Sequence, residues 1–241
     1  MQELEQVLED FKKKKTELKV LEKLKSWKEA TVFKVEKDGQ IFALKVYKNL
    51  NERTFQKNSA YIEGKFYISR AQAKAVKAKN TFGKQLMQNN WIKREFYMLR
   101  KIFELWGNIP KPEDFVDSWI LMQYIWWEEK AASRLQELDL SIKETKEIFK
   151  KVIGNIEIFL KAWIVYSDLS EFNILYFDNE IYIIDFPQSV DIRNNPNTAK
   201  FLERDLKNVC KFFSRKLEEI DHKLIFKTLS NKYLHNAKRI D

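Results

Sequence analysis

The sequence predicts an α+β protein of two lobes, a small β-rich lobe followed by a mostly helical one. The first observation is "ATVFKVEKDGQIFALKVYK", in which apolar and polar residues alternate as they do in half-buried strands. The second is the helical spacing of apolar residues through 141–163 and much of 198–230. Because strands occupy the first half and helices the second, we place the junction near residues 122–128. No repeat, low-complexity tract or Gly/Ser linker divides the chain further.

The first lobe is predicted to follow an N-terminal helix. Residues 3–25 carry apolar side chains at helical spacing with charges between them, which indicates one amphipathic helix, with a break near Lys15 as the alternative. Residues 30–36 and 41–47 form the predicted hairpin, joined at Asp38 and Gly39, a strong signal for a two-residue turn. The predicted segments are 1–25 for the N-terminal helix, 26–121 for the first lobe with a basic insertion, and 122–241 for the second lobe.

Further elements follow from local helix and strand signals. "WIKREFYMLRKIFEL" has the apolar spacing of a helix, and Pro110 and Pro112 stop it. "SWILMQYIWW" is a short apolar run typical of a buried strand, and "EIYIIDF" predicts another strand. Ser141 and Glu144 have the spacing of a capping box, so a helix of the second lobe is expected to begin there.

The composition is that of a globular protein and excludes several classes. The 241 residues are 44% hydrophobic and 33% charged, which suits one large or two-lobed domain. A single cysteine, Cys210, excludes an intramolecular disulfide, and with two histidines it makes a Cys/His zinc site a poor interpretation. No apolar run approaches the ~20 residues needed to cross a bilayer, and the start "MQELEQVLED" is too acidic for a targeting peptide. We expect a cytoplasmic protein with no membrane partner.

Most of the positive charge lies in one stretch, residues 70–101. Nine basic residues against the single acid Glu95 give this stretch +8 of the formal +9. Such a concentration suits a phosphate-rich partner, although surplus lysine also serves as an ordinary solvated surface. Its early part, "RAQAKAVKAK", has few large apolar residues to bury and is predicted to be a mobile loop. The basic residues are Arg70, Lys74, Lys77, Lys79, Lys84, Lys93, Arg94, Arg100 and Lys101.

A spacing of polar residues in the second lobe indicates phosphoryl transfer. In "YSDLSEFNIL", Asp168 stands five residues before Asn173, and Asp185 follows at the next strand. If the three side chains meet at one loop mouth, their oxygens suit Mg²⁺, which completes its octahedron with phosphates and waters. A carboxylate beside that metal can orient an attacking hydroxyl. The alternative is that Asp168 is a turn residue, Asn173 a cap and Asp185 a strand end.

Lys45 is the predicted phosphate-contacting lysine of the first lobe. It lies in "FALKVYK" between the apolar Leu44 and Val46. In lobes of the kinase type, a strand lysine contacts the α- and β-phosphates and pairs with a helix glutamate. Glu95 is the one acid between residues 70 and 101, so we expect it to be the partner. A surface role for Lys45 is the alternative.

Together these motifs resemble the RIO family of atypical protein kinases. "DLSEFNIL" is similar to the catalytic loop of that family, "IYIIDFPQSV" to its metal loop, and "FLERDLKNVCKFF" to the helix that follows. "SWKEATVF" resembles its phosphate loop and "FQKNSAYIEGKF" its insertion after the lysine strand, as found in the branch without a winged helix. The resemblance covers residues 26–213. It implies a two-lobed protein-kinase-like fold that uses ATP and Mg²⁺.

The resemblance also implies roles for individual residues of the second lobe. Asp168 corresponds to the catalytic aspartate that steers the hydroxyl proton, and Asn173 and Asp185 correspond to the magnesium ligands. In this family the metal aspartate, here Asp185, is further implicated as a phosphoryl acceptor during ATP hydrolysis. The family acts in maturation of the small ribosomal subunit, so a pre-ribosomal or rRNA partner would account for the basic stretch 70–101.

The remaining roles implied by the resemblance concern nucleotide binding. Lys45 and Glu95 correspond to the phosphate-positioning pair. Met122 and Ile125, in "LMQYI", correspond to the hinge residues that contact adenine.

Three positions depart from the family pattern. Trp27 stands where the phosphate loop usually has glycine, which removes backbone freedom. Tyr166 replaces the usual histidine, and Pro187 stiffens the metal loop and removes a donor. Two other functions are kept open, the first because it shares an aspartate-to-asparagine loop and a later aspartate, and the second because of these three departures. One is a small-molecule phosphotransferase of the aminoglycoside type, and the other is a degenerate kinase that serves as a nucleotide-binding scaffold.

Overall fold

The structure is a computed structural model that describes residues 2–13, 17–27, 30–48, 81–127 and 130–234. The chain divides into two compact units, each described here by itself. The first consists of residues 1–56, 66–100 and 110–124, and the second of residues 57–65, 101–109 and 125–241.

An antiparallel five-stranded sheet, in the order β1-β2-β3-β5-β4, forms the centre of the first unit. The predicted hairpin is confirmed as β2 and β3, and Asp38 and Gly39 both have positive φ, as their turn requires. The apolar run "SWILMQYIWW" supplies a buried strand, β5, as predicted. The strands are β1 Leu18–Ser26, β2 Ala30–Lys37, β3 Gln40–Tyr47, β4 Pro112–Val116 and β5 Trp119–Gln123.

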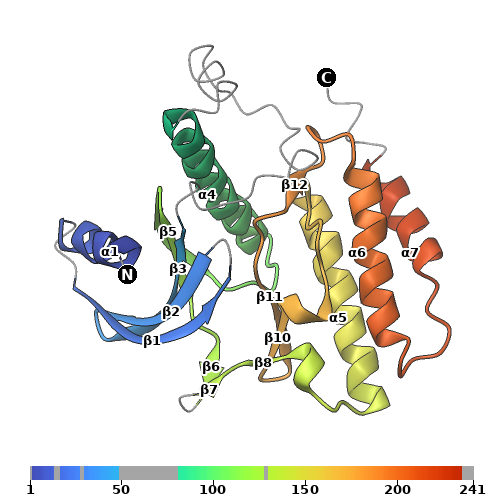
Figure 1. Ribbon diagram of the computed structural model, residues 1–241. Coiled ribbons are helices and arrows are strands. Elements are labelled where there is room, and N and C mark those ends of the chain that lie inside the picture. Colours follow the sequence, from blue (N-terminus) through green and yellow to red (C-terminus); the bar gives the residue numbers. More distant parts are fainter. Residues whose placement is uncertain (1, 14–16, 28–29, 49–80, 128–129, 235–241) are drawn as a thin grey trace. The chain divides into compact units, whose positions relative to one another are not determined.

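Side chains that alternate along β3 and β5 give this sheet two apolar faces. On one face Leu44 and Trp119 pack against helix α1, Gln2–Lys13, where the ring of Phe11 stacks on Trp119 with centroids 4.5 Å apart. On the other face Tyr47 and Ile120 pack against helix α4, Thr81–Glu104. Helices α1 and α4 thus cover opposite faces of the sheet (Figure 1). Period-two alternation explains how one strand serves both layers.

The N-terminal segment differs from its prediction. The expected helix over residues 3–25 ends at Lys13, and Leu18–Ser26 form strand β1, which pairs with β2. Val20 and Leu18 lie in the apolar cluster under α1. The sheet thereby gains a partner that covers the free edge of β2, and this tertiary pairing overrides the weak helical pattern of a lysine- and leucine-rich segment. The predicted boundaries of the three segments stay a prediction.

The second unit is mostly helical, with small sheets between the helices. Helices α5, α6 and α7 lie side by side (Figure 1). The segment 198–230, predicted as largely helical, forms α6 and α7 with a break at residues 214–221. The helices are α5 Ile142–Lys161, α6 Thr198–Phe213, α7 His222–Leu229 and the short turns Leu135–Glu137, Glu171–Asn173 and Ser230–Leu234. The strands are β6 Trp126–Trp127, β7 Lys130–Ala131, β8 Ser133–Arg134, β9 Ile164–Val165, β10 Ile174–Phe177, β11 Glu180–Ile183 and β12 Val190–Asp191.

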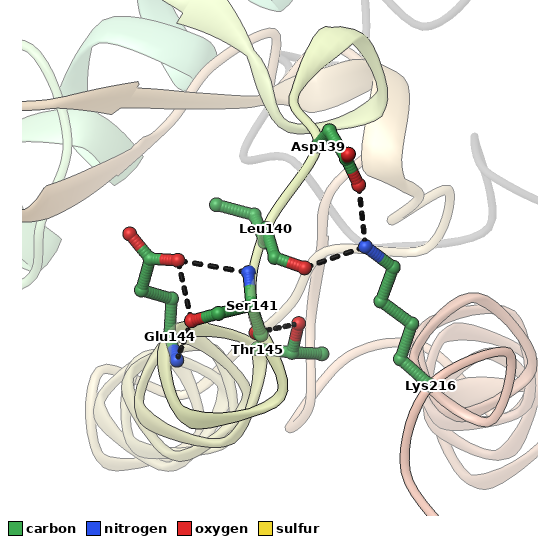
Figure 2. Close-up of polar contacts among 6 residues, drawn as sticks. All are labelled: Asp139, Leu140, Ser141, Glu144, Thr145 and Lys216. Atoms are coloured by element: carbon green, nitrogen blue, oxygen red, sulfur yellow. Dashed lines mark hydrogen bonds and ion pairs between the residues drawn. The ribbon is translucent and has the colours of Figure 1, made fainter.

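The capping box predicted for α5 is present. The Ser141 hydroxyl accepts from the Glu144 amide at 3.3 Å, and the Glu144 carboxylate accepts from the Ser141 amide at 2.8 Å (Figure 2). Lys216, just after α6, donates to the carboxylate of Asp139 at 2.7 Å and to the carbonyl of Leu140 at 2.5 Å. The start of α5 is therefore fixed both by its own cap and by the end of α6. Within the described ranges, no helix is long and apolar enough to span a membrane.

Candidate functional site

Lys45 and Glu95 are in contact inside the first unit. The Lys45 Nζ lies 2.8 Å from Glu95 Oε1, and both residues are buried, with exposed fractions of 6% and 3%. Glu95 projects from α4 between Ile92 and Phe96 toward the sheet face from which Lys45 extends. The surface role kept as an alternative for Lys45 is excluded by this burial. The predicted ion pair is present, while its role toward phosphates stays a prediction.

A tyrosine that the sequence analysis did not single out completes this pair. The hydroxyl of Tyr47 donates to Glu95 Oε2 at 2.6 Å, so each oxygen of the buried carboxylate has its own donor. Tyr47 follows Lys45 by two positions on β3 and therefore extends from the same face. The two-residue spacing of Lys45 and Tyr47 on one strand is the sequence signal that could have identified Tyr47.

The two residues expected at adenine lie on consecutive segments. Met122 is half-buried on β5, where it pairs with Ala43 and packs in the cluster with Tyr47. Ile125 belongs to the second unit and is buried, and its carbonyl accepts from the Ala132 amide at 3.0 Å. The structure shows their backbone setting, and their contact with adenine stays a prediction.

The segment that resembles a phosphate loop is a tight connection between β1 and β2. The Trp27 amide donates to the Ala30 carbonyl at 2.8 Å, and Lys48 Nζ donates to the Trp27 carbonyl at 2.6 Å. Trp27 is not among the residues with positive φ, so its backbone conformation does not need glycine. The backbone at Trp27 therefore carries no strain that glycine would relieve, and the effect of Trp27 on the approach of a nucleotide stays a prediction. Residues 28 and 29 lie outside the described ranges.

The loop that carries Asp168 is held by helix α6. The carboxylate of Asp205 accepts from the amides on both sides of Asp168, Ser167 at 2.7 Å and Leu169 at 2.9 Å. Arg204 donates to the Ser167 carbonyl, and Asn208 donates to the Leu169 carbonyl at 3.3 Å. Ser167 has a φ of 71°, which is unfavourable for a non-glycine residue, and these bonds hold it there. The anchors belong to the "RDLKN" part of the motif quoted above, although no role was assigned to them individually.

Two carboxylates of this loop region have raised pKa values. Asp168 is exposed, but protein surrounds part of its side chain. This loss of water raises the pKa of Asp168, the charge of Arg204 lowers it, and the charge of Asp185 raises it. Burial raises the pKa of Asp205 to about 7, against the lowering effect of the Leu169 and Ser167 amides. Asp168 and Asp185 are thus close enough for the charge of one to raise the pKa of the other, as it does for Asp168.

Asn173 and Asp185 meet at one end of a hairpin. Strands β10 and β11 pair Ile174 with Ile183, so Asn173 precedes one strand and Asp185 follows the other. The Ile184 amide donates to the Asn173 carbonyl at 2.9 Å and ties the two ends together. The Asn173 side chain also donates weakly to the Asp168 carbonyl, at 3.4 Å. The hairpin therefore brings Asn173 and Asp185 to the same end, and the Asn173 side chain reaches the backbone of Asp168, while a common magnesium site of the three residues stays a prediction.

Tyr166, the departure from the usual histidine, anchors the segment that carries Asp185. Its buried hydroxyl lies 2.5 Å from the Ile184 carbonyl and 2.6 Å from the Asp185 carbonyl, and its ring packs against Phe159 and Phe186. Asp185 has a φ of 69°, so its backbone needs support. Tyr166 thus connects the segment before Asp168 with the segment that carries Asp185, while the change relative to histidine stays a prediction.

Asn173 and Asp185 fit a magnesium site in their chemistry. One carboxylate and one amide oxygen are ligands that Mg²⁺ prefers, provided that phosphates and waters supply the rest. Among the described residues, no group of three His, Cys, Asp or Glu side chains is placed to hold a metal alone.

Part of the basic stretch 70–101 lies in α4, and its early part, predicted to be a mobile loop, lies outside the described residues. Lys93 and Arg100 are exposed on the helix, and Arg94 and Lys101 are half-buried. The pKa of Lys101 is lowered, first by loss of water and then by the nearby charge of Arg193.

Comparisons with known proteins agree with the motifs. The family model named RIO domain matches residues 31–225. The RIO-type serine/threonine-protein kinase Rio1 of Methanocaldococcus jannaschii is 30% identical over 210 residues, covering 86% of this chain and 67% of the relative. Human serine/threonine-protein kinase RIO1 is 30% identical over 192 residues, covering 78% of this chain and 32% of the relative. The chain thus spans about two thirds of the archaeal relative and about one third of the human one.

The fold has a solved counterpart. The Rio2 kinase from Chaetomium thermophilum, solved as an ADP/Mg²⁺-phosphoaspartate complex, matches 97% of this chain and 74% of its own with a TM-score of 0.65 and 18% identity. At that identity the likeness concerns the fold alone, and it confirms the kinase-like fold predicted from the sequence. Since the family model spans most of the chain and the sequence relatives carry the same domain, the chain belongs to the RIO family of atypical protein kinases.

Proposed function

We propose that this chain binds Mg-ATP and transfers its γ-phosphoryl group to a serine or threonine hydroxyl, to water, or to both. The observation that carries the proposal is the gathering of Asp168, Asn173 and Asp185 at the end of the β10–β11 hairpin. Membership of the RIO family supports it, because relatives such as human RIO1 are named serine/threonine-protein kinases.

Each residue of the second unit has a distinct part in this proposal. Magnesium, when bound with ATP, supplies positive charge against the phosphates, and Asn173 and Asp185 would hold it. Asp168 would accept a hydrogen bond from the attacking hydroxyl and steer its proton. Its raised pKa suits this task, since a carboxylate held partly away from water is a better base than an ordinary one.

The first unit would bind the nucleotide. Lys45, held by Glu95, would contact the α- and β-phosphates as a point charge. Met122 and Ile125 would border adenine. Burial of the Lys45–Glu95 pair gives its charge more effect than it has in water, because fewer water dipoles screen it.

Hydrolysis of ATP through Asp185 is part of the proposal. The Rio2 complex from Chaetomium thermophilum contains a phosphoaspartate. In this chain the corresponding step would join the γ-phosphorus of ATP to a carboxylate oxygen of Asp185 and release ADP, and water would then break the acyl phosphate to give inorganic phosphate. Acid-stable phosphoserine or phosphothreonine on a protein substrate would instead identify the kinase reaction.

The first test compares three aspartates in Mg-ATP turnover and binding. Asp185→Asn is expected to reduce magnesium-dependent turnover by at least about a hundredfold, because it removes a metal charge. Asp168→Asn is expected to lose turnover and retain nucleotide affinity. Asp178→Asn is the matched control, since Asp178 is an exposed turn residue with positive φ on the same hairpin. Loss of ATP binding in Asp168→Asn, with magnesium-dependent turnover intact in Asp185→Asn, would refute the assignment.

We further propose that the basic stretch 70–101 contacts a precursor of the small ribosomal subunit or its rRNA, which would place the chain in the cytoplasm. The net charge of +8 over this stretch supports a phosphate-rich partner. ATP turnover measured with and without small ribosomal subunits distinguishes this proposal from the two alternatives. Subunits would not change the turnover of a small-molecule phosphotransferase or of a degenerate scaffold. Stimulation is expected.

The RNA contact has its own signature in salt dependence. If about four basic residues meet phosphates, log K falls with log salt at a slope near about −4. Replacing Lys74, Lys77 and Lys79 with glutamine is expected to flatten the slope by up to about three contacts and to leave ATP affinity unchanged. An unchanged slope in the triple variant would favour a protein partner, with the lysines serving only as solvated surface.

A further inference from the structure

Tyr47 occupies a place in the first unit that packing alone does not explain. It ends β3 and is 2% exposed, and its ring lies edge-on to Trp91 with centroids 6.0 Å apart. The same cluster contains Ile92, Phe96 and Ile120, so a phenylalanine would fill the space as well. Packing against these apolar neighbours accounts for the ring of Tyr47 but not for its hydroxyl.

That hydroxyl is directed at a charged group. It donates to Glu95 Oε2 at 2.6 Å, while Lys45 Nζ contacts the other oxygen of the same carboxylate at 2.8 Å. The Lys45 ammonium also lies 5.2 Å from the centre of the Tyr47 ring, within range of a cation–π contact. Three buried side chains therefore form a closed triangle, in which each member contacts the other two.

The second donor limits how the carboxylate can turn. The last torsion of a glutamate side chain is broad, so a carboxylate held at one oxygen retains freedom to rotate. A donor on each oxygen fixes its plane and with it the direction in which Glu95 holds the ammonium of Lys45. Since charge-assisted hydrogen bonds are short and strong, the 2.6 Å contact is well suited to this task.

We propose that Tyr47 is a positioning residue for phosphate binding: through Glu95, its hydroxyl fixes the place of the Lys45 ammonium. This inference rests on the proposed function, because it takes Lys45 to be the group that meets the α- and β-phosphates. Tyr47 itself touches no substrate in this scheme. Tyr47 therefore affects the affinity for ligands that carry phosphates and leaves the affinity for adenosine unchanged.

The experiment measures affinity for two ligands by calorimetry on the full chain, Mg-ADP and adenosine. Tyr47→Phe is expected to weaken Mg-ADP binding roughly tenfold, the scale of one hydrogen bond to a charged group, and to leave adenosine binding unchanged. Tyr233→Phe is the matched control, because the Tyr233 hydroxyl also donates to a glutamate, Glu157, at 2.6 Å but belongs to the second unit near its C-terminal end. It is expected to leave both affinities unchanged.

A donor at position 47 is expected to rescue binding. Replacement of Tyr47 by 4-aminophenylalanine keeps the ring and restores an N–H donor, and most of the Mg-ADP affinity is expected to return. In a Lys45→Met background, Tyr47→Phe is expected to have no further effect on Mg-ADP, since the group through which it acts is gone. Circular dichroism of each variant at the titration temperature confirms that folded protein is being compared.

The outcomes separate this inference from the function beneath it. Wild-type protein that fails to bind Mg-ADP overturns the proposed function and the inference with it. Wild-type binding that Tyr47→Phe matches overturns the inference alone. Equal weakening of Mg-ADP and adenosine in Tyr47→Phe, or failure of the amino group to restore affinity, would also overturn it, because either result marks Tyr47 as a packing residue.

Discussion

The two groups of site residues are held in place by different means. In the first unit, Lys45 is held by a side chain, the carboxylate of Glu95, whose other oxygen accepts from the hydroxyl of Tyr47. In the second unit, Asp168 is fixed through the backbone, since the amides of its two neighbours donate to Asp205. In both units a support comes from a distant helix, Glu95 at 50 residues from Lys45 and Asp205 at 38 residues from Ser167, and only Tyr47 lies two residues along the same strand. The groups that hold a site residue therefore need not belong to its own motif.

The difference has a physical basis. Lys45 and Glu95 are charged and buried, so their main cost is the loss of water, and direct pairing offsets it. The loops of the second unit contain residues with positive φ, Ser167 and Asp185, whose cost is backbone strain. Hydrogen bonds to the neighbouring amides and carbonyls keep that strained path in place. Substitutions in the two regions should accordingly separate charge effects from backbone effects.

The largest expected effect is that of Lys45→Met. We expect turnover to fall by several orders of magnitude, because catalysis of phosphoryl transfer consists mostly of positioning and charge stabilisation. Stability should also fall, by about 3 to 5 kcal/mol, because the variant leaves Glu95 charged and buried without its lysine. Urea unfolding and ATP turnover measure the two losses separately.

A double variant sharpens the same comparison. Lys45→Met with Glu95→Gln removes both charges, and it should regain most of the lost stability while turnover stays absent. If the double variant is as unstable as the single one, burial of the unpaired charge is not the cause of the instability.

Asp205→Ala is expected to have the next largest effect. The amides of Ser167 and Leu169 would lose their acceptor in a fully buried setting, and the loop that carries Asp168 would relax from its present path. We expect turnover to drop roughly a hundredfold with a smaller change in nucleotide affinity. Glu203→Ala, an exposed position on the same helix, is the control. Retention of turnover in Asp205→Ala would show that the loop holds its shape without α6.

Tyr166→Phe removes one hydroxyl from the metal-loop segment. Because that hydroxyl lies within hydrogen-bond distance of the Ile184 and Asp185 carbonyls, we expect about a tenfold loss of turnover and a need for more magnesium. Tyr166→His restores the residue usual in the family and can donate to one carbonyl, so it should retain more activity than the phenylalanine variant. Titration of turnover against Mg²⁺ distinguishes the two. Full activity in Tyr166→Phe would mean that the aromatic ring alone suffices.

The sequence predicts strands β2, β3 and β5 of the first unit and the polar spacing of the second for a clear reason. Alternation along β3, the Asp38–Gly39 turn and the spacing of Asp168 and Asn173 are all local patterns. Each depends on the few residues around it, so no tertiary information is needed to recognise it.

What the sequence does not predict depends on contacts between distant segments. Strand β1 forms because β2 offers an edge, and its lysines and leucines by themselves suit a helix equally well. Asp205 holds the loop only because α6 packs against it at Ser167, and no periodic pattern in the sequence indicates that contact. Tyr166 was identified as a departure, but its two carbonyl partners become apparent only when the loops are placed side by side.

The last expected effect is a pH dependence, which tests whether burial of Asp205 outweighs its hydrogen bonds to the loop amides. Burial raises the pKa of Asp205 from its ordinary 3.8 to about 7, so the folded protein retains this proton where the unfolded chain has lost it. The folded state then binds more protons between about pH 4 and 7, and the free energy of unfolding falls as pH rises through that window, levelling off above it. Asp205→Asn cannot titrate and should lack this component. Urea unfolding of both proteins at steps from about pH 5 to 8.5 gives the difference. If the stability of the wild type relative to Asp205→Asn does not fall with pH over this range, the amides of Ser167 and Leu169 outweigh burial and keep Asp205 ionised.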